Sequence, residues 1–440
     1  MTISVDGDVR QLLAEMRRVR AHVEAEGSAI LHGWQPMLKR PAFRPGATNL
    51  AHYLAFREID LRPLQKSLVT LGLSGLGRSE SRVMATLDAV IANLATLCGE
   101  PGAATGRPGT DHMWSGVAAL KSASDALFGP PVDGRETRIL VTMSPKAAKN
   151  AEHVEALVKA GMDAARINCA HDGTKAWTKM IENIRASAAA HGRSCPILMD
   201  LQGPKIRTRT VLIPEDGDPV EAGDHILITF GEPEPRRDFP YQASCAMPDV
   251  LRQVAAGAKV SIKDGLIVGH VEEVRPEGLL VAVTRTPPDG QPLETEKGIN
   301  FPGTTLTVSP LSAEDLEDLD FVAEHADMVG YSFVQSKEDV ALLQAELEKR
   351  RAGRPPLAIV AKIETQLAFR NLPEIIAQAA GANPFAVMIA RGDLAVELGF
   401  ERMSEVPRQI LALCEAAHVP AIWATQVLES MAKTGQPSRA

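Results

Sequence analysis

Two stretches of sequence, LAIVAKIE at residues 357–364 and FAVMIARGD at residues 385–393, decide the predicted fold of this chain. Each begins with apolar residues that are β-branched or small, as is typical of strands buried in a parallel sheet. Lys362, Glu364 and Asp393 therefore follow at the carboxyl ends of two strands, where the active sites of α/β barrels lie. Two carboxylates beside one ammonium suit a divalent metal ion and an anionic, phosphate-bearing substrate.

The same alternation of strand and helix runs through much of the chain. The predicted strands are Ile139–Met143, Ala164–Asn168, Pro196–Asp200, Met328–Phe333, Leu357–Ala361, Phe385–Ala390 and Ala421–Ala424. The predicted helices between them are Ala147–Ala160, Lys175–Ala190, Lys337–Glu348, Pro373–Ala380 and Val406–Ala417. This rhythm predicts an α/β fold, a (β/α)8-type TIM barrel at residues 135–208 and 298–440. Since a closed barrel needs eight strands, the eighth is missing from the predicted set.

Two other segments have different patterns. Residues 1–134 are predicted to form a helical N-terminal region that ends at a cluster of glycines and prolines, Gly129–Gly134. Its predicted helices are Val9–Ala25, Leu61–Leu73, Ser79–Leu97 and Met113–Leu127, in which apolar residues recur three and four apart. Residues 209–297 carry short β-rich pieces between glycines, prolines and aspartates, so they are predicted to form a small inserted β domain.

Composition excludes several classes of function. The chain has 440 residues and a formal net charge of −8, without the basic stripe that nucleic-acid binding requires. The first residues lack the apolar core of a signal peptide, and no apolar run is long enough to cross a membrane. The five cysteines are scattered without a Cys-x-x-Cys spacing, which indicates neither a zinc site nor a disulfide framework. We therefore expect a cytoplasmic protein with reduced cysteines and no nucleic-acid or membrane partner.

Six motifs at predicted strand ends and in the inserted domain resemble, in order, those of the pyruvate kinase family. They are ARIN at 165–168, MDLQGPKIRT at 199–208, KDGLI at 263–267, AKIE at 361–364, ARGDL at 390–394 and ATQVLESM at 424–431. The resemblance covers about residues 137–440 and leaves the N-terminal helical region unexplained. It implies transfer of the phosphoryl group of phosphoenolpyruvate to ADP, giving pyruvate and ATP, with the inserted β domain as a lid.

The resemblance also implies roles for individual residues. Lys362 matches the lysine that stabilises the transferring phosphoryl group, Arg166 the arginine that binds phosphate, and Thr425 the threonine near the enolate carbon, and these three are the expected catalytic residues. The expected substrate-binding residues are Arg166, Lys362, Arg391, Gly392, Asp393 and Thr425.

A divalent metal ion and a nucleotide are implied as well. Glu364 and Asp393 match the metal ligands, and all-oxygen ligation favours Mg²⁺, with Mn²⁺ as an alternative. Arg207 and His171 match the nucleotide-binding positions, so ADP and ATP are expected partners beside phosphoenolpyruvate.

The chain departs from the family at the site for a monovalent cation. Asn168 and Asp200 remain, but Ala170 stands where the family has a serine and Leu201 where it has a threonine. Lys205 replaces the usual glutamate of that motif, and an ammonium can take the place of K⁺ electrostatically. The sequence therefore predicts that K⁺ is not required.

Two alternative functions stay open. A metal-dependent lyase or aldolase acting on pyruvate-like substrates could use the same lysine and carboxylates. A catalytically impaired paralogue with a binding or regulatory role is the second alternative, because Ala170 and Ala395 replace usual family residues. The oligomeric state also stays open, a homo-oligomer being one of the options.

Overall fold

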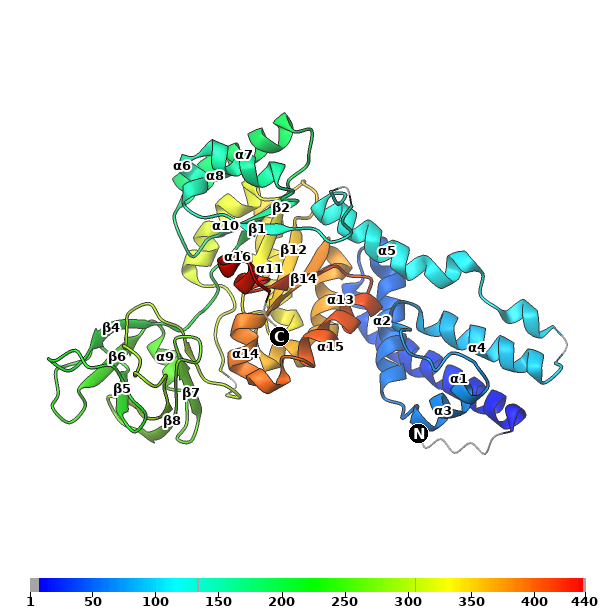
Figure 1. Ribbon diagram of the computed structural model, residues 1–440, viewed down its shortest axis with the longest axis horizontal. Helices are drawn as coiled ribbons and strands as arrows, with labels where there is room; N and C mark the ends of the chain where they lie inside the picture. Colours follow the sequence, from blue (N-terminus) through cyan, green and yellow to red (C-terminus); the bar gives the residue numbers. More distant parts are fainter. Residues whose placement is uncertain (1–7, 101, 133, 305, 438–440) are drawn as a thin grey trace.

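The computed structural model describes residues 8–100, 102–132, 134–304 and 306–437. Three parts follow one another along its longest axis (Figure 1). The inserted β domain lies at one end, the parallel sheet with its helices in the middle, and the N-terminal helices at the other end.

The central part is a parallel sheet of seven strands among the described residues. Its order is β1 (Leu140–Thr142), β2 (Ala164–Asn168), β3 (Ile197–Asp200), β11 (Met328–Tyr331), β12 (Ala358–Ile363), β13 (Phe385–Ala390) and β14 (Ala421–Ala424). All six neighbouring pairs are parallel, so the carboxyl ends of the strands meet on one side of the sheet. The predicted α/β barrel fold with an inserted β domain is confirmed, and β1 and β14 are the edges of the described sheet.

One or two helices follow each of these strands along the chain. They are α6 (Lys146–Lys149), α7 (Ala151–Lys159), α8 (Thr174–Ala190), α10 (Ala313–His325), α11 (Lys337–Arg350), α12 (Gln366–Arg370), α13 (Leu372–Ala382), α14 (Arg391–Leu398), α15 (Val406–Ala416) and α16 (Glu429–Thr434). The single helix predicted over residues 147–160 is wrong, because the chain breaks at Asn150. The side-chain oxygen of Asn150 accepts a hydrogen bond from the backbone of His153 and so caps α7.

The inserted domain is a second sheet with its own apolar core. Its order is β10 (Ile299–Asn300), β7 (Lys259–Ile262), β8 (Ile267–Val274), β9 (Gly278–Arg285), β5 (His225–Thr229), β6 (Tyr241–Cys245) and β4 (Thr208–Leu212), with the short helix α9 (Pro248–Leu251). The segments that enter and leave it run side by side, since Arg207 and Gly298 form an antiparallel bridge. We call residues 205–208 and 297–300 the hinge.

The N-terminal region forms helices of which all but the last share one continuous apolar core with the sheet and its helices, while the last contributes Leu127 and Phe128 to a separate apolar cluster. They are α1 (Val9–Trp34), α2 (Arg44–Arg57), α3 (Arg62–Thr70), α4 (Val83–Leu97) and α5 (Thr110–Phe128), of which α2 was not predicted from the sequence. The contact with α13 and α15 is close: a Cβ atom on Gly381 would lie 2.3 Å from the carbonyl oxygen of Met37. No helix in the described ranges is both long and apolar enough to cross a membrane.

The carboxyl end of α5 fills the amino end of the sheet. Leu127 and Phe128 are buried there against residues from β2, β3 and β11, namely Ala164, Leu198 and Met328. The opposite end of the sheet, at which the predicted site residues lie, stays clear of the N-terminal helices.

The first prediction concerns this apolar plug. We expect Phe128→Ala to lower the free energy of unfolding by about 3 to 5 kcal/mol, because it leaves a cavity at the amino end of the strands. Urea unfolding followed by circular dichroism measures the change. Val117→Ala on the same helix is the control, since Val117 is 43% exposed and should cost less than about 1 kcal/mol. Equal stability of the two variants would contradict the packing described here.

Candidate active site

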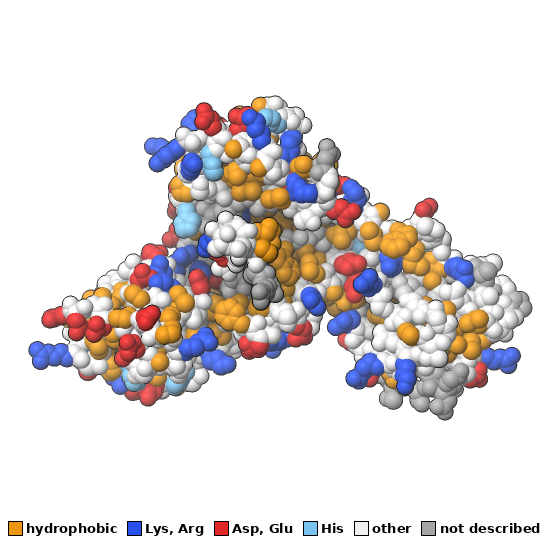
Figure 2. Space-filling model, in the orientation of Figure 1, with side chains coloured by type: hydrophobic (Ala, Val, Ile, Leu, Met, Phe, Trp, Pro, Cys, Tyr) orange, Lys and Arg blue, Asp and Glu red, His pale blue; other side chains and the backbone are white. Residues whose placement is uncertain are grey.

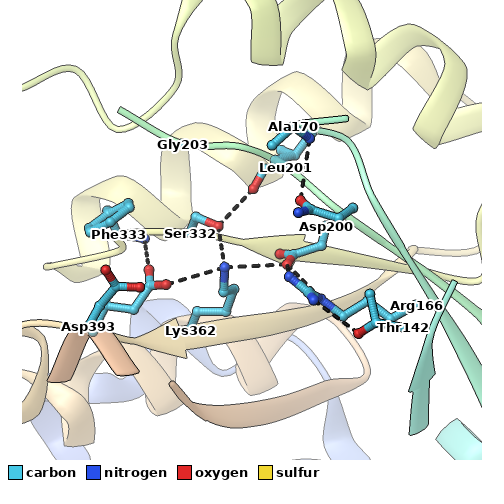
Figure 3. Close-up of polar contacts among 12 residues, drawn as sticks. Thr142, Arg166, Ala170, Asp200, Leu201, Gly203, Ser332, Phe333, Lys362 and Asp393 are labelled. Atoms are coloured by element: carbon cyan, nitrogen blue, oxygen red, sulfur yellow. Dashed lines mark hydrogen bonds and ion pairs between the residues drawn. The ribbon is translucent and has the colours of Figure 1, made fainter. Parts of the chain in front are cut away.

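Four strand ends place charged side chains at the carboxyl edge of the sheet. Arg166 lies on β2, Asp200 ends β3, Lys362 lies near the end of β12, and Asp393 follows β13 in the first turn of α14. These side chains lie close together in Figure 3, where Lys362 stands between Asp200 on one side and Asp393 on the other. The strands are parallel and in register, with Arg166 beside Leu198 and Lys362 beside Met388. Their carboxyl ends, and the charged side chains on them, therefore lie at the same edge of the sheet.

Lys362 is the centre of the cluster. Its ammonium donates a hydrogen bond of 2.7 Å to Ser332 Oγ and lies 3.3 Å from Asp200 Oδ2 and 3.2 Å from Glu364 Oε1. Burial alone would lower the pKa of Lys362, but the carboxylates of Asp200 and Glu364 outweigh it and raise the pKa. Lys362 is therefore a fixed cation at the carboxyl end of the sheet.

Glu364 and Asp393 form the acidic side of the cluster. Glu364 is almost fully buried, and its Oε2 accepts a 2.6 Å hydrogen bond from the backbone N–H of Phe333. Burial raises the pKa of Glu364, Lys362 lowers it, and the negative charge of Asp393 raises it further. The two carboxylates thus repel each other, and a cation bound between them would relieve that repulsion.

This donor set fits a divalent metal ion of the magnesium type. Two carboxylates supply hard oxygen ligands, which Mg²⁺ prefers, and it commonly completes its shell with substrate oxygens and water. Among the described residues no group of three or more His, Cys, Asp or Glu side chains is placed to hold a metal by itself. Glu364 and Asp393 would therefore share the ion with a bound substrate.

Asp200 and Arg166 form a buried ion pair next to Lys362. Asp200 is completely buried, and its Oδ2 accepts hydrogen bonds from Arg166 Nε at 2.8 Å and from Arg166 Nη2. Burial would raise the pKa of Asp200, but Lys362 and Arg166 outweigh it, so the pKa is lowered. Arg166 also donates to Thr142 Oγ1 at 3.1 Å, which fixes the plane of its guanidinium.

Lys205 differs from its expected position. The sequence places its ammonium in the monovalent-cation pocket with Asn168 and Asp200, whereas the structure pairs it with Asp393 Oδ1 at 2.8 Å. The physical reason is that Asp393 offers a partly exposed carboxylate within reach of the four-carbon stem, whereas Asp200 is fully buried beside Arg166 and Lys362. Asp200 Oδ1 has no hydrogen-bond partner among the described residues.

Arg391, Gly392 and Thr425 meet at the ends of β13 and β14. Arg391 donates to the carbonyl oxygens of Ala424, at 2.9 Å, and of Thr425. Gly392 suits this close approach, because a Cβ atom there would lie 3.0 Å from Thr425 Cγ2. Thr425 itself is exposed and has a positive φ of 70°, which turns the chain immediately after β14.

Four other predicted residues lie around the cluster without joining it. Asn168 Oδ1 accepts a 3.3 Å hydrogen bond from the backbone of Ala170, and the carbonyl of Leu201 accepts one of 2.7 Å from Ser332. Arg207 lies in the hinge, and its buried Nε has no partner among the described residues. His171 is exposed on the loop after β2, where its carbonyl accepts a hydrogen bond from Trp177.

Sequence reasoning missed the groups that hold these charges in place. Ser332 is buried and links Lys362 to Leu201, while the Phe333 amide and Thr142 bind Glu364 and Arg166. Ser332 and Thr142 each stand at or directly after a strand end, at the positions that identified Lys362 and Asp200. Their position at strand ends was the sequence signal that could have identified Ser332 and Thr142.

The fold and the site define a class of protein: a parallel β/α barrel with an inserted β domain, which presents fixed cations and paired carboxylates at the carboxyl ends of its strands. The family described as "Pyruvate kinase, barrel domain" matches residues 134–440. This match spans well over half of the chain, so the chain belongs to the pyruvate kinase family.

Curated proteins from three domains of life are similar to the chain. Pyruvate kinase PKLR of Homo sapiens is 32% identical over 318 residues, which cover 70% of this chain and 53% of the relative. The pyruvate kinase of Thermococcus litoralis is 35% identical over 307 residues, covering 69% of the chain and 61% of the relative. That of Mycobacterium tuberculosis is 34% identical over 307 residues, covering 70% and 61%. The chain thus spans between half and two thirds of the length of these relatives.

The second prediction tests the buried ion cluster. We expect Asp200→Asn to lower the free energy of unfolding at pH 7 by about 3 to 5 kcal/mol, because Arg166 and Lys362 lose their buried counter-charge. The pKa of Asp200 is lowered in the folded chain, so its stabilisation is present above the unfolded pKa of about 4 and is lost as the pH falls through the lower folded value.

Urea unfolding at a series of pH values measures this difference. The gap between wild type and Asp200→Asn should shrink at acidic pH. Asp320→Asn is the control, because Asp320 is an exposed partner of Arg350 and should change stability by less than about 1 kcal/mol. A gap that is independent of pH would contradict the assigned charge of Asp200.

Proposed function

We propose that this chain carries the catalytic part of a pyruvate kinase, which transfers the phosphoryl group of phosphoenolpyruvate to ADP in glycolysis. The observation that carries the proposal is the buried ammonium of Lys362, fixed between Asp200 and Glu364 beside the second carboxylate of Asp393. A phosphoryl group in transfer spreads negative charge over its oxygens, and a fixed cation stabilises it without reorganising at the moment of reaction.

The neighbouring residues then have distinct roles. Arg166, held by Asp200 and Thr142, presents its guanidinium to the phosphate of the substrate. Glu364 and Asp393 hold the Mg²⁺ or Mn²⁺ ion, which supplies positive charge to the substrate oxygens when bound. Arg391 and Gly392 shape the backbone next to the substrate, and the Thr425 hydroxyl supports proton delivery to the enolate carbon through water.

The inserted domain supports phosphoryl transfer over the lyase alternative. Acidic and basic side chains gather where this domain meets the barrel (Figure 2), and its hinge adjoins Asp393 through Lys205. A domain in this position can close over a nucleotide and exclude water from the reacting phosphoryl group, a need that a lyase does not have.

Arg207, in the hinge, and His171 are the proposed nucleotide-binding residues. We also propose a cytoplasmic location, supported by the five cysteines, all of which are free.

The third prediction is that the chain forms pyruvate from phosphoenolpyruvate and ADP in the presence of Mg²⁺. An assay coupled to lactate dehydrogenase measures the pyruvate formed. We expect Lys362→Met to lower kcat by at least about 100-fold, because the cation beside the phosphoryl group is lost. Glu364→Gln should raise the Mg²⁺ concentration needed for half-maximal activity. Lys349→Met, which removes an exposed lysine on α11, is the control and should leave activity unchanged.

The possible outcomes separate the candidate functions. Turnover lost only in the site variants supports the kinase. Binding of phosphoenolpyruvate without turnover in wild type would instead support the impaired paralogue, and pyruvate release from a longer keto acid without ADP would support the lyase.

The fourth prediction concerns monovalent cations. We expect replacement of Na⁺ by K⁺ at equal ionic strength to change kcat/KM by less than about twofold, because Lys205 adds a positive charge to the carboxyl edge of the sheet whether or not its ammonium contacts Asp393. Initial rates at fixed phosphoenolpyruvate, ADP and Mg²⁺ measure the effect. Strong activation by K⁺ would contradict this role of Lys205 and would point to cation binding at the unpartnered Oδ1 of Asp200.

A further inference from the structure

One lysine joins three separate parts of the molecule. Lys205 belongs to the hinge strand that enters the inserted domain, and its ammonium lies 2.8 Å from Asp393 Oδ1 on α14. The aliphatic part of the Lys205 side chain lies against the hinge segment that leaves the domain, since a Cβ atom on Gly298 would lie 2.8 Å from Lys205 Cε. Both hinge strands are therefore tied through Lys205 to a residue proposed as a metal ligand.

A second acid on α14 faces the same hinge. Glu397 lies four residues after Asp393, and residues at this spacing share one face of a helix. Glu397 lines a cavity of about 390 Å³ together with Lys205 and Asn300 of the hinge. Burial raises the pKa of Glu397 to about 7, while a hydrogen bond with Asn300 opposes the shift. Asp393 and Glu397 thus form one face of α14 that contacts the hinge.

Lys205 and a divalent ion would compete for Asp393. Among the described residues, Lys205 is the one lysine or arginine at ion-pair distance from Asp393, and both side chains are about one-fifth exposed. A divalent ion shared by Glu364 and Asp393 would stand next to the Lys205 ammonium, and two cations at that distance repel each other strongly. The flexible stem of Lys205 allows the ammonium to leave Asp393.

We propose that Lys205 is a positioning residue that holds the hinge against α14 while Asp393 carries no metal, and that it releases the hinge when a divalent ion binds there. This inference rests on the proposed metal site at Glu364 and Asp393. The coupling is reciprocal: Lys205 weakens metal binding by as much as metal binding weakens the hold of Lys205 on Asp393. Lid position is thereby linked to metal occupancy.

The test measures Mn²⁺ binding to the full chain without substrates, by the electron paramagnetic resonance signal of free Mn²⁺. We expect Lys205→Met to bind Mn²⁺ about tenfold more tightly than wild type, because the competing ammonium is gone. Lys205→Arg, which keeps the charge, should remain close to wild type. Lys263→Met is the matched control: Lys263 is similarly buried but pairs with Glu294 in the inserted domain, so its loss should leave Mn²⁺ affinity unchanged.

A second readout follows the hinge directly. Amide hydrogen exchange at residues 205–208 and 297–300 should increase when Mn²⁺ is added to wild type. In Lys205→Met the exchange should already be fast and should not respond to Mn²⁺. If the rate of amide hydrogen exchange in the hinge changes neither with Mn²⁺ nor with the substitution, the proposed coupling is overturned.

Asp393→Asn separates this inference from the proposed function. If Asp393→Asn weakens Mn²⁺ binding but Lys205→Met leaves it unchanged or weaker, the metal site stands and the competition is refuted. If Asp393→Asn binds Mn²⁺ as wild type does, the metal is not at Asp393, and the metal site and the inference fail together.

Discussion

The charge balance around Lys362 is the constraint on which the site depends. Its ammonium lies within 3.3 Å of the buried carboxylates of Asp200 and Glu364 and donates to Ser332. None of these charged groups could be buried alone at acceptable cost, because an isolated charge loses its hydration. Arg166 and the Phe333 amide complete the balance, so the ends of β2, β3, β11 and β12 must all be in register.

The amino and carboxyl ends of the sheet have different structural roles. Leu127 and Phe128 close the amino end with apolar side chains, and the preceding N-terminal helices pack on α13 and α15 in a second apolar core. The carboxyl end keeps its polar groups and connects through the hinge to the inserted domain. A rigid, apolar half thus supports a charged half, which allows long side chains such as Lys362 to be held at fixed positions.

Much of this fold was predictable because it follows from local patterns. All seven strands of the parallel sheet were predicted, since buried strands are short apolar runs bounded by polar residues. Helices α2, α9, α10, α12, α14 and α16 were missed. Helix α10 begins with a capping box of Ser312 and Asp315, a local signal that was present in the sequence. Helix α14 was hidden because its first turn, Arg391–Asp393, was interpreted only as a site motif.

The sequence by itself determined which residues stand at strand ends, and therefore that Lys362, Glu364, Asp393 and Arg166 belong to one edge of the sheet. Only the tertiary structure decided which charges pair. Lys205 illustrates the difference, because its partner Asp393 lies 188 residues away and is partly exposed, whereas Asp200 is fully buried beside Arg166 and Lys362. Strand periodicity decides the face of the sheet to which each side chain points, whereas the partner of a long side chain is decided by the competition among all charges within its reach.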